Sequence, residues 1–188
     1  MSLHIISAPM FSGKTTNLLF KLSQEVAIYK KALYINHSID TRSENAFSSH
    51  NPLLKDYLNL DGLTMKKYEY LPELNDILEY DVIGIDEFSF FTNYQNVLHY
   101  VEKGHKKVII TGLLSDYNRQ TFGHILDLIP YCDSYTQLYA YCTECAKNGL
   151  SVHSLFTHRL VTTTDQIDIG AHDKYIPLCR QHYLDLNK

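Results

Sequence analysis

The feature that most constrains this chain is a short loop between an apolar segment and an amphipathic one. Residues 3–7 have the pattern of a strand, and residues 16–29 carry apolar side chains at helical spacing. The loop between them is Ala8-Pro9-Met10-Phe11-Ser12-Gly13-Lys14-Thr15. In such a loop, backbone N–H groups and the helix N-terminus bind phosphate oxygens, the lysine reaches the β- and γ-phosphates, and the threonine hydroxyl holds Mg²⁺. The sequence therefore predicts a nucleotide-phosphate site with Lys14 and Thr15 in those roles.

This loop departs from the pattern G-x-x-x-x-G-K-[ST] at its first position, where Ala8 replaces glycine. An alternative interpretation is an ordinary turn at a helix N-terminus, with Lys14 in solvent. The order of strand, loop, Gly-Lys-Thr and helix favours the phosphate site.

Strand-like and helix-like segments alternate up to about Pro130. We expect further strands at 32–36, around Tyr68, at 82–87 and at 107–111, and helices at 71–79 and 93–103, with Asn93 as N-cap and Gly104 as stop. This order predicts an α/β fold of the P-loop NTPase type, with a parallel sheet covered by helices on both faces. Ligands bind such sheets at the carboxyl ends of the strands.

The pattern changes after Pro130, because helical periodicity fades and strand-like segments appear at 135–141 and 160–164. A pair of cysteines also enters there. We therefore expect a nucleotide-binding domain over residues 1–140 and a smaller domain over residues 141–188.

Two adjacent acids, Asp86 and Glu87, close the apolar segment 82–85. An acid at a strand end beside a phosphate loop can hold Mg²⁺, and a neighbouring carboxylate can accept a proton from the attacking hydroxyl. We assign Asp86 to magnesium and Glu87 to the general base. The alternative is that both acids cap the next turn or stay solvated.

The 4 cysteines include two pairs of potential metal ligands, Cys142-Thr-Glu-Cys145 and Cys179-Arg-Gln-His182. In each pair the two-residue spacing lets a tight turn point both side chains at one ion, and a Cys₃His set suits tetrahedral, structural Zn²⁺. His153 or His172 could replace His182. Cys132 lies in an apolar stretch, which favours a buried core thiol.

Composition limits the partners of this chain. Its 188 residues are 45% apolar, and its net charge of -4 argues against a broad basic surface for nucleic acid. The sequence has neither an apolar run long enough for a membrane span nor a secretory signal. We expect an intracellular, cytoplasmic protein that binds neither nucleic acid nor membrane.

Two further groups of residues are candidates for ligand contacts. Asp40-Thr41-Arg42 follows the second expected strand, where an arginine could reach phosphate oxygens, but a solvated loop is the alternative. Tyr117, Phe122 and Tyr175 could stack on a flat ring, although packing is the default explanation.

The order of these motifs resembles one family, the type II thymidine kinases of cells and viruses, which carry a zinc-ribbon lasso. The resemblance covers nearly the whole chain. It rests on the motifs Pro9 to Thr15, Asp40-Thr41-Arg42, Ile83 to Glu87 with Phe90-Phe91, Phe122-Gly123, and Asp173-Lys174-Tyr175.

The resemblance implies an ATP- and Mg²⁺-dependent kinase that phosphorylates the 5′-hydroxyl of thymidine, and of deoxyuridine, in deoxynucleoside salvage for DNA synthesis. It also implies a homotetramer with structural Zn²⁺, located in the cytoplasm, which for a viral member is that of the host. Glu87 resembles the base. Residues implied to contact ATP are Ala8 to Thr15, Asp40, Thr41, Arg42, Asp86 and Ser89. Residues implied to contact the nucleoside are Met10, Phe90, Leu113, Tyr117, Phe122, the lasso residues Gln166, Ile167, Asp168, Ile169 and Gly170, and Tyr175.

Four positions depart from the family pattern. Ala8 replaces a glycine, which would strain the backbone by about 1 kcal/mol if its φ must be positive. Leu113 to Tyr117 replaces a Leu-Asp-Gly run followed by an aromatic residue. Ser89 replaces a glutamine, and His182 replaces a fourth cysteine found in many members. Two alternatives stay open, a non-catalytic nucleotide-binding paralogue and a P-loop ATPase or nucleic-acid-binding module with a zinc ribbon.

Overall fold

A computed structural model describes residues 1–40, 60–161, 166 and 174–187. The predicted site residues Thr41, Arg42, Ile167, Asp168, Ile169 and Gly170 lie outside these ranges, as does most of the segment 160–164. The alternative ligand His172 lies outside them as well.

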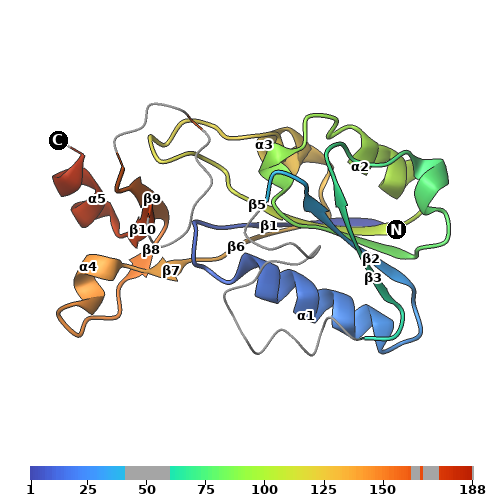
Figure 1. Cartoon of the computed structure of the whole chain (residues 1–188), viewed down its shortest axis with the longest axis horizontal. Helices are drawn as coiled ribbons and strands as arrows, with labels where there is room; N and C mark the ends of the chain where they lie inside the picture. Colours follow the sequence, from blue (N-terminus) through green and yellow to red (C-terminus); the bar gives the residue numbers. More distant parts are fainter. Residues whose placement is uncertain (41–59, 162–165, 167–173, 188) are drawn as a thin grey trace.

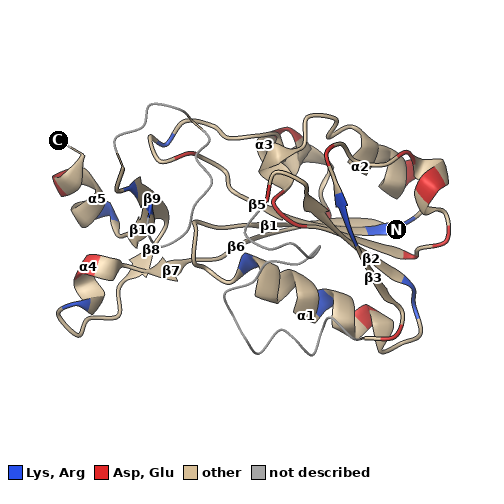
Figure 2. Cartoon of the chain, in the orientation of Figure 1, with Lys and Arg blue, Asp and Glu red and all other residues tan. Residues whose placement is uncertain are grey.

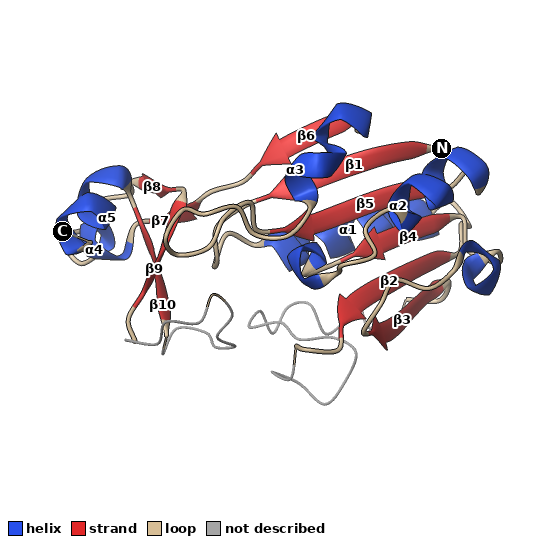
Figure 3. Ribbon diagram, turned by 90° about the horizontal axis from the view of Figure 1, so that it is seen from above, coloured by secondary structure: helices blue, strands red, loops and turns tan. Residues whose placement is uncertain are grey.

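The first part of the chain forms a six-stranded sheet in which all neighbouring strands are parallel, in the order β3-β2-β4-β5-β1-β6. The sheet is seen in Figure 3. Its strands are β1 (Ser2–Ser7), β2 (Ala32–His37), β3 (Leu63–Tyr68), β4 (Val82–Ile85), β5 (Lys107–Gly112) and β6 (Ser134–Gln137). The α/β fold with a parallel sheet is confirmed.

One face of the sheet is covered by helix α1 (Lys14–Val26), as Figure 1 shows. Alternate residues of the strands point to this face and form a buried cluster with α1 that contains Ile6, Leu18, Leu19, Leu22, Ala32, Tyr34, Val82 and Ile109. Gly84 lies under the helix, because a Cβ built there would be only 2.6 Å from a methyl carbon of Leu22. A side chain at this position would push α1 away from the sheet.

The opposite face carries the other half of the core. There the alternate strand residues Leu3, Ile5, Leu33, Ile35, Ile83, Ile85, Val108 and Ile110 pack against Phe88, Val97, Tyr100, Ile125 and Leu128. These partners come from four short elements, the 3₁₀ helix Phe88–Phe90, α2 (Asn96–Leu98), the π-helical turn His99–Lys103 and α3 (Ile125–Leu128). Helices therefore cover both faces, as the alternating pattern predicts.

Four local predictions need correction. The helix expected at 71–79 is only a 3₁₀ helix, Leu74–Ile77, and the helix expected at 93–103 begins at Asn96. Asn93 does not cap it, because its side chain bonds both the backbone N–H and the carbonyl of Leu71. Tyr29 lies beyond the end of α1 with a φ of 64° and is 98% exposed, so it does not belong to the apolar face of α1.

The described residues from 140 onward form a group of short elements beyond the carboxyl ends of the strands (Figure 1). We call residues 140–187 the C-terminal unit. Two antiparallel strand pairs, β7 with β8 and β9 with β10, are flanked by two helices. Its elements are β7 (Ala140–Tyr141), α4 (Thr143–Ala146), β8 (His153–Ser154), β9 (Phe156–Arg159), β10 (Tyr175–Leu178) and α5 (Arg180–Leu186). A 3₁₀ helix, Ile129–Tyr131, precedes β6.

Basic and acidic residues are interspersed over these elements (Figure 2). Within the described ranges, no helix has both the length and the apolar character needed to cross a bilayer.

Candidate active site

The phosphate loop follows β1 and ends where α1 begins. Gly13 precedes the helix with a φ of 79°, and Phe11 also has a positive φ, 64°. A Cβ at Gly13 would meet nothing within 4 Å, so the backbone conformation alone requires glycine there. Ala8 is not among the residues with positive φ. The strain considered for Ala8 is therefore absent.

Two side chains of the loop converge on one carbonyl. The Ser12 hydroxyl donates to the carbonyl oxygen of Pro9 at 2.7 Å, and the Lys14 ammonium donates to the same oxygen at 3.1 Å. Lys14 is only 9% exposed, which excludes the alternative of a solvated lysine. The ammonium is thus held inside the loop at the start of α1, where the helix N-terminus favours anions.

The acid predicted to hold magnesium lies directly against this loop. The Thr15 hydroxyl donates to Oδ2 of Asp86 at 2.6 Å. Asp86 is 3% exposed and directly follows β4, so this buried strand fixes the position of the carboxylate. The structure therefore brings together the two residues that the sequence analysis assigned to magnesium, and excludes a solvated Asp86.

Three further donors reach the Asp86 carboxylate. The Tyr34 hydroxyl donates to Oδ2 at 2.9 Å, while the Thr111 hydroxyl and the backbone N–H of Glu87 donate to Oδ1. Burial, together with the charge of Asp86, raises the pKa of Tyr34 well above its ordinary value. The phenol accordingly stays protonated and remains a donor.

Glu87, the predicted base, adopts an unusual backbone conformation. Its φ of 49° is left-handed, which costs a non-glycine residue about 1 kcal/mol and is frequent at functional sites. The turn directs the chain from β4 into the 3₁₀ helix Phe88–Phe90. Glu87 is half-buried beside the buried Asp86.

Ser89 and Asp40 are bound within the protein. The Ser89 hydroxyl donates to the carbonyl of Leu113 and accepts from the N–H of the same residue, tying the turn after β4 to the end of β5. The Asp40 carboxylate accepts from the Asn36 amide at 3.0 Å, and its backbone carbonyl accepts from Lys67. Their contacts with ATP stay predictions.

The predicted nucleoside residues occur in two groups. Phe90 and Phe122 meet edge to face, with ring centroids 5.4 Å apart. Tyr117 and Tyr175 are joined by Arg159, a residue that the sequence analysis did not single out. The Arg159 guanidinium lies 3.9 Å from the Tyr117 ring centroid and donates to the Tyr175 hydroxyl at 2.8 Å.

Arg159 also reaches the described part of the lasso. It donates to the carbonyl of Gln166 at 3.2 Å, and the Gln166 amide donates to the Asp116 carboxylate at 3.0 Å. Arg159 is 6% exposed. Arg159 was not predictable from sequence, because no local pattern indicates that this arginine is buried.

The C-terminal unit contacts the phosphate loop directly. The N–H of Met10 donates to the Thr157 hydroxyl at 3.3 Å, and the Tyr183 hydroxyl donates to the carbonyl of Tyr117. A cavity of about 260 Å³ lies between the two parts, and its lining includes Ala8, Pro9, Leu113, Phe156 and Thr157. Thr157 was also missed by the sequence analysis. Both units therefore line one cavity beside the phosphate loop.

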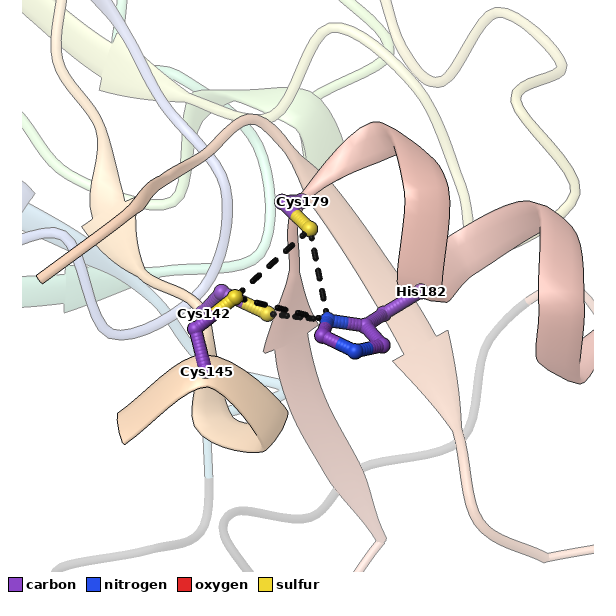
Figure 4. Close-up of side chains that lie close together, drawn as sticks. All are labelled: Cys142, Cys145, Cys179 and His182. Carbon is purple, nitrogen blue, oxygen red and sulfur yellow. Dashed lines mark hydrogen bonds between the residues drawn. The ribbon is translucent and has the colours of Figure 1, made fainter. Parts of the chain in front are cut away.

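The four predicted metal ligands form a compact cluster, shown in Figure 4. Nδ1 of His182 lies 3.4 Å from Sγ of Cys142, 3.5 Å from Sγ of Cys145 and 3.4 Å from Sγ of Cys179. All four ligand atoms lie within 4.8 Å of one another. Three thiols and one imidazole nitrogen are the donor set that tetrahedral Zn²⁺ prefers.

The electrostatics of the cluster also fit a cation. Burial opposes ionisation of Cys142, but hydrogen bonds from Cys179, Cys145 and His182 outweigh burial and lower its pKa to about 6. Burial and the neighbouring thiols raise the pKa of Cys145 to about 11. Three crowded sulfurs cannot all ionise without a compensating positive charge, so a divalent ion would stabilise the cluster.

Comparison with known proteins gives a consistent result. A family model described as thymidine kinase matches residues 1–183. A thymidine kinase of Amsacta moorei entomopoxvirus is 36% identical over 187 residues, which cover 97% of this chain and 98% of that protein. Thymidine kinase a of Arabidopsis thaliana is 34% identical, over 97% of this chain and 75% of the relative. The cytosolic thymidine kinase of Cricetulus griseus is 33% identical, over 96% and 72%.

The first prediction concerns the metal cluster. Cys145→Ser replaces one thiolate ligand, and the zinc content of the purified protein should fall from about one ion per chain to near zero. The C-terminal unit should lose stability, since metal-binding energy is folding energy in small units. Cys132→Ser is the control, because Cys132 packs against the core of the sheet. Elemental analysis decides, and a zinc-free but stable wild-type protein would contradict the assignment.

The second prediction concerns Gly123, which follows Phe122. Its φ is +66°, and a Cβ there would lie 2.6 Å from Cα of Ser89. Gly123→Ala should therefore displace Ser89 and Leu113 and lower the free energy of unfolding. Gly149→Ala is the matched control, because Gly149 has a φ of +73° and open space around it. We expect Gly123→Ala to cost about 1–3 kcal/mol more than the control in urea unfolding. Equal losses would mean that only φ matters.

Proposed function

Because the chain belongs to the thymidine kinase family, we propose that it transfers the γ-phosphoryl group of ATP to the 5′-hydroxyl of thymidine, giving dTMP. The observation that carries this proposal is the contact between Thr15 of the phosphate loop and Asp86, with Glu87 next along the chain. Deoxyuridine is proposed as a second acceptor. Family membership disfavours the ATPase or nucleic-acid-binding module considered from sequence.

Phosphoryl transfer needs positioning and charge neutralisation more than covalent chemistry. The N–H groups of the loop and the start of α1 bind the phosphates of ATP, and Lys14 reaches the β- and γ-phosphates. Thr15 and Asp86 would hold Mg²⁺, which neutralises negative charge on the phosphates when bound. Glu87 accepts the proton of the thymidine 5′-hydroxyl as that oxygen attacks the γ-phosphorus.

The nucleoside is proposed to lie between the aromatic residues of the sheet domain and the C-terminal unit. Met10, Phe90, Leu113, Tyr117, Phe122 and Tyr175 would line this space. Arg159 supports the proposal, because it fixes Tyr117 and Tyr175 relative to each other and holds the backbone of Gln166. A lasso closed over the nucleoside would exclude water and suppress hydrolysis of ATP.

Several other assignments belong to the same proposal. We infer that the metal of the Cys₃His cluster is zinc with a structural role, since four protein ligands leave no open position for a water nucleophile. We also propose a boundary between two domains near residue 140, a homotetrameric assembly, and a cytosolic location, the last supported by a relative named as cytosolic.

The third prediction separates chemistry from binding. Glu87→Gln keeps the shape of the side chain but cannot accept a proton, so turnover should fall roughly 10²–10⁴-fold while ATP still binds. Lys14→Ala should weaken ATP binding itself. The control is Glu102→Gln at an exposed glutamate of the π-helical turn. Steady-state rates with ATP and thymidine measure the effect, and near-normal turnover in Glu87→Gln would assign the base to another group.

The fourth prediction concerns the acceptor. Backbone groups of a lasso can match the O4, N3–H and O2 edge of thymine, whereas deoxycytidine reverses part of that edge and leaves buried groups unpaired. A missing methyl group costs only about 1–3 kcal/mol. Initial rates should rank thymidine first, then deoxyuridine, with deoxycytidine and purine nucleosides far behind. Equal use of deoxycytidine would contradict recognition by the lasso, and no phosphorylation of any nucleoside would indicate a non-catalytic paralogue.

A further inference from the structure

Two buried hydroxyl groups that belong to neither the phosphate loop nor the acid pair converge on Asp86. Tyr34 lies in β2 and Thr111 in β5, on the two strands that flank β4 in the sheet. Tyr34 belongs to the buried cluster under α1, and Thr111 points to the same face because it lies two residues after Ile109 of that cluster. Both residues are completely buried. Tyr34 is the Cα partner of Gly84, two residues before Asp86, so its long side chain can extend to the carboxylate.

The four donors occupy both oxygens of the carboxylate. Tyr34 and Thr15 donate to Oδ2, while Thr111 and the N–H of Glu87 donate to Oδ1. A carboxylate accepts about four hydrogen bonds, so these four neutral donors of the described residues match the hydrogen-bonding capacity of Asp86. Buried charge is tolerated only with such a set of partners.

The four donors differ in one respect. Thr15 belongs to the phosphate loop, and its hydroxyl is the group proposed to turn to magnesium when nucleotide binds. Tyr34 and Thr111 are held in the sheet, on the two strands that flank β4. Release of Thr15 would therefore open one acceptor direction on Oδ2, while the other three donors keep the carboxylate in place.

We propose that Tyr34 and Thr111 are positioning residues that fix the Asp86 carboxylate for the magnesium ion of the nucleotide complex. This inference rests on the proposed function only in assuming that Asp86 helps to hold the magnesium ion. Both hydroxyls are completely buried and act through Asp86. Their effect is on the strength of the magnesium contribution to ATP binding, because a carboxylate free to rotate must be ordered when the ion binds.

The test measures the affinity for ATP by calorimetry twice, with excess Mg²⁺ and with a chelator. The ratio of the two affinities gives the magnesium contribution without any turnover. Tyr34→Phe and Thr111→Val each remove one hydroxyl with little change of shape, and each should reduce this ratio about tenfold, the effect of losing one hydrogen bond to a charged group. Affinity for metal-free ATP should not change. Thr111→Ser keeps the hydroxyl and should restore the ratio.

Tyr100→Phe is the matched control. Tyr100 is also completely buried, and its hydroxyl donates to the carbonyl of Pro72 on the opposite side of the sheet. This variant should lose stability as Tyr34→Phe does but keep the wild-type ratio. If Tyr34→Phe does not fold, the comparison of Thr111→Val with Thr111→Ser decides alone.

The outcomes distinguish this inference from the proposed function. The wild-type ratio of ATP affinities with and without Mg²⁺ should be well above one. If Tyr34→Phe and Thr111→Val leave this ratio unchanged, the positioning role is overturned and the kinase proposal stays intact. A fall in the ratio that also appears in Tyr100→Phe or Thr111→Ser overturns it too, since that fall reflects general destabilisation. A wild-type ratio of about one would overturn the assignment of Asp86 to magnesium, and this inference with it.

Discussion

A buried carboxylate that follows a central strand of the sheet is hydrogen-bonded to the first turn of α1. Asp86 follows β4, and Thr15 lies one residue into the helix. This contact fixes where α1 begins relative to the carboxyl ends of the strands. Gly84 allows the same helix to lie close to the sheet, since a Cβ there would meet Leu22 and Leu18. Helix position and site geometry are therefore set by the same few residues.

The buried carboxylate also requires hydrogen-bond donors from the residues around it. A carboxylate that is 3% exposed must have hydrogen-bond partners, and each bond to a charged group is worth about 1.5–3 kcal/mol. The chain supplies a hydroxyl from each neighbouring strand, that of Tyr34 from β2 and that of Thr111 from β5. Tyr34 packs in the same cluster as Val82 and Ile109, so it belongs to the core and to the site at once. The left-handed Glu87 then turns the chain sharply away from this cluster.

Much of this arrangement is predictable from sequence, because the responsible signals are local. The phosphate loop, the acids after β4 and the ligand pairs Cys142/Cys145 and Cys179/His182 are short motifs with fixed spacing, and the structure brings the members of each together. The helices on the sheet face opposite α1 are shorter than predicted. Apolar spacing does not reveal a competing hydrogen bond, such as that between Asn93 and Leu71. Thr157, Arg159 and Tyr34 act through contacts between distant segments, which no local pattern records. The absence of strain at Ala8 likewise depends on a φ value that only the folded loop defines.

We propose that the phosphate loop, Asp86 and Glu87 direct the γ-phosphoryl group to a nucleoside and not to water. The most direct measurement follows the label of [γ-³²P]ATP in the presence and absence of thymidine, and separates nucleoside monophosphate from inorganic phosphate. We predict that label leaves ATP mainly when thymidine is present and that it appears in dTMP. Label that accumulates as inorganic phosphate at the same rate with and without thymidine would contradict the account.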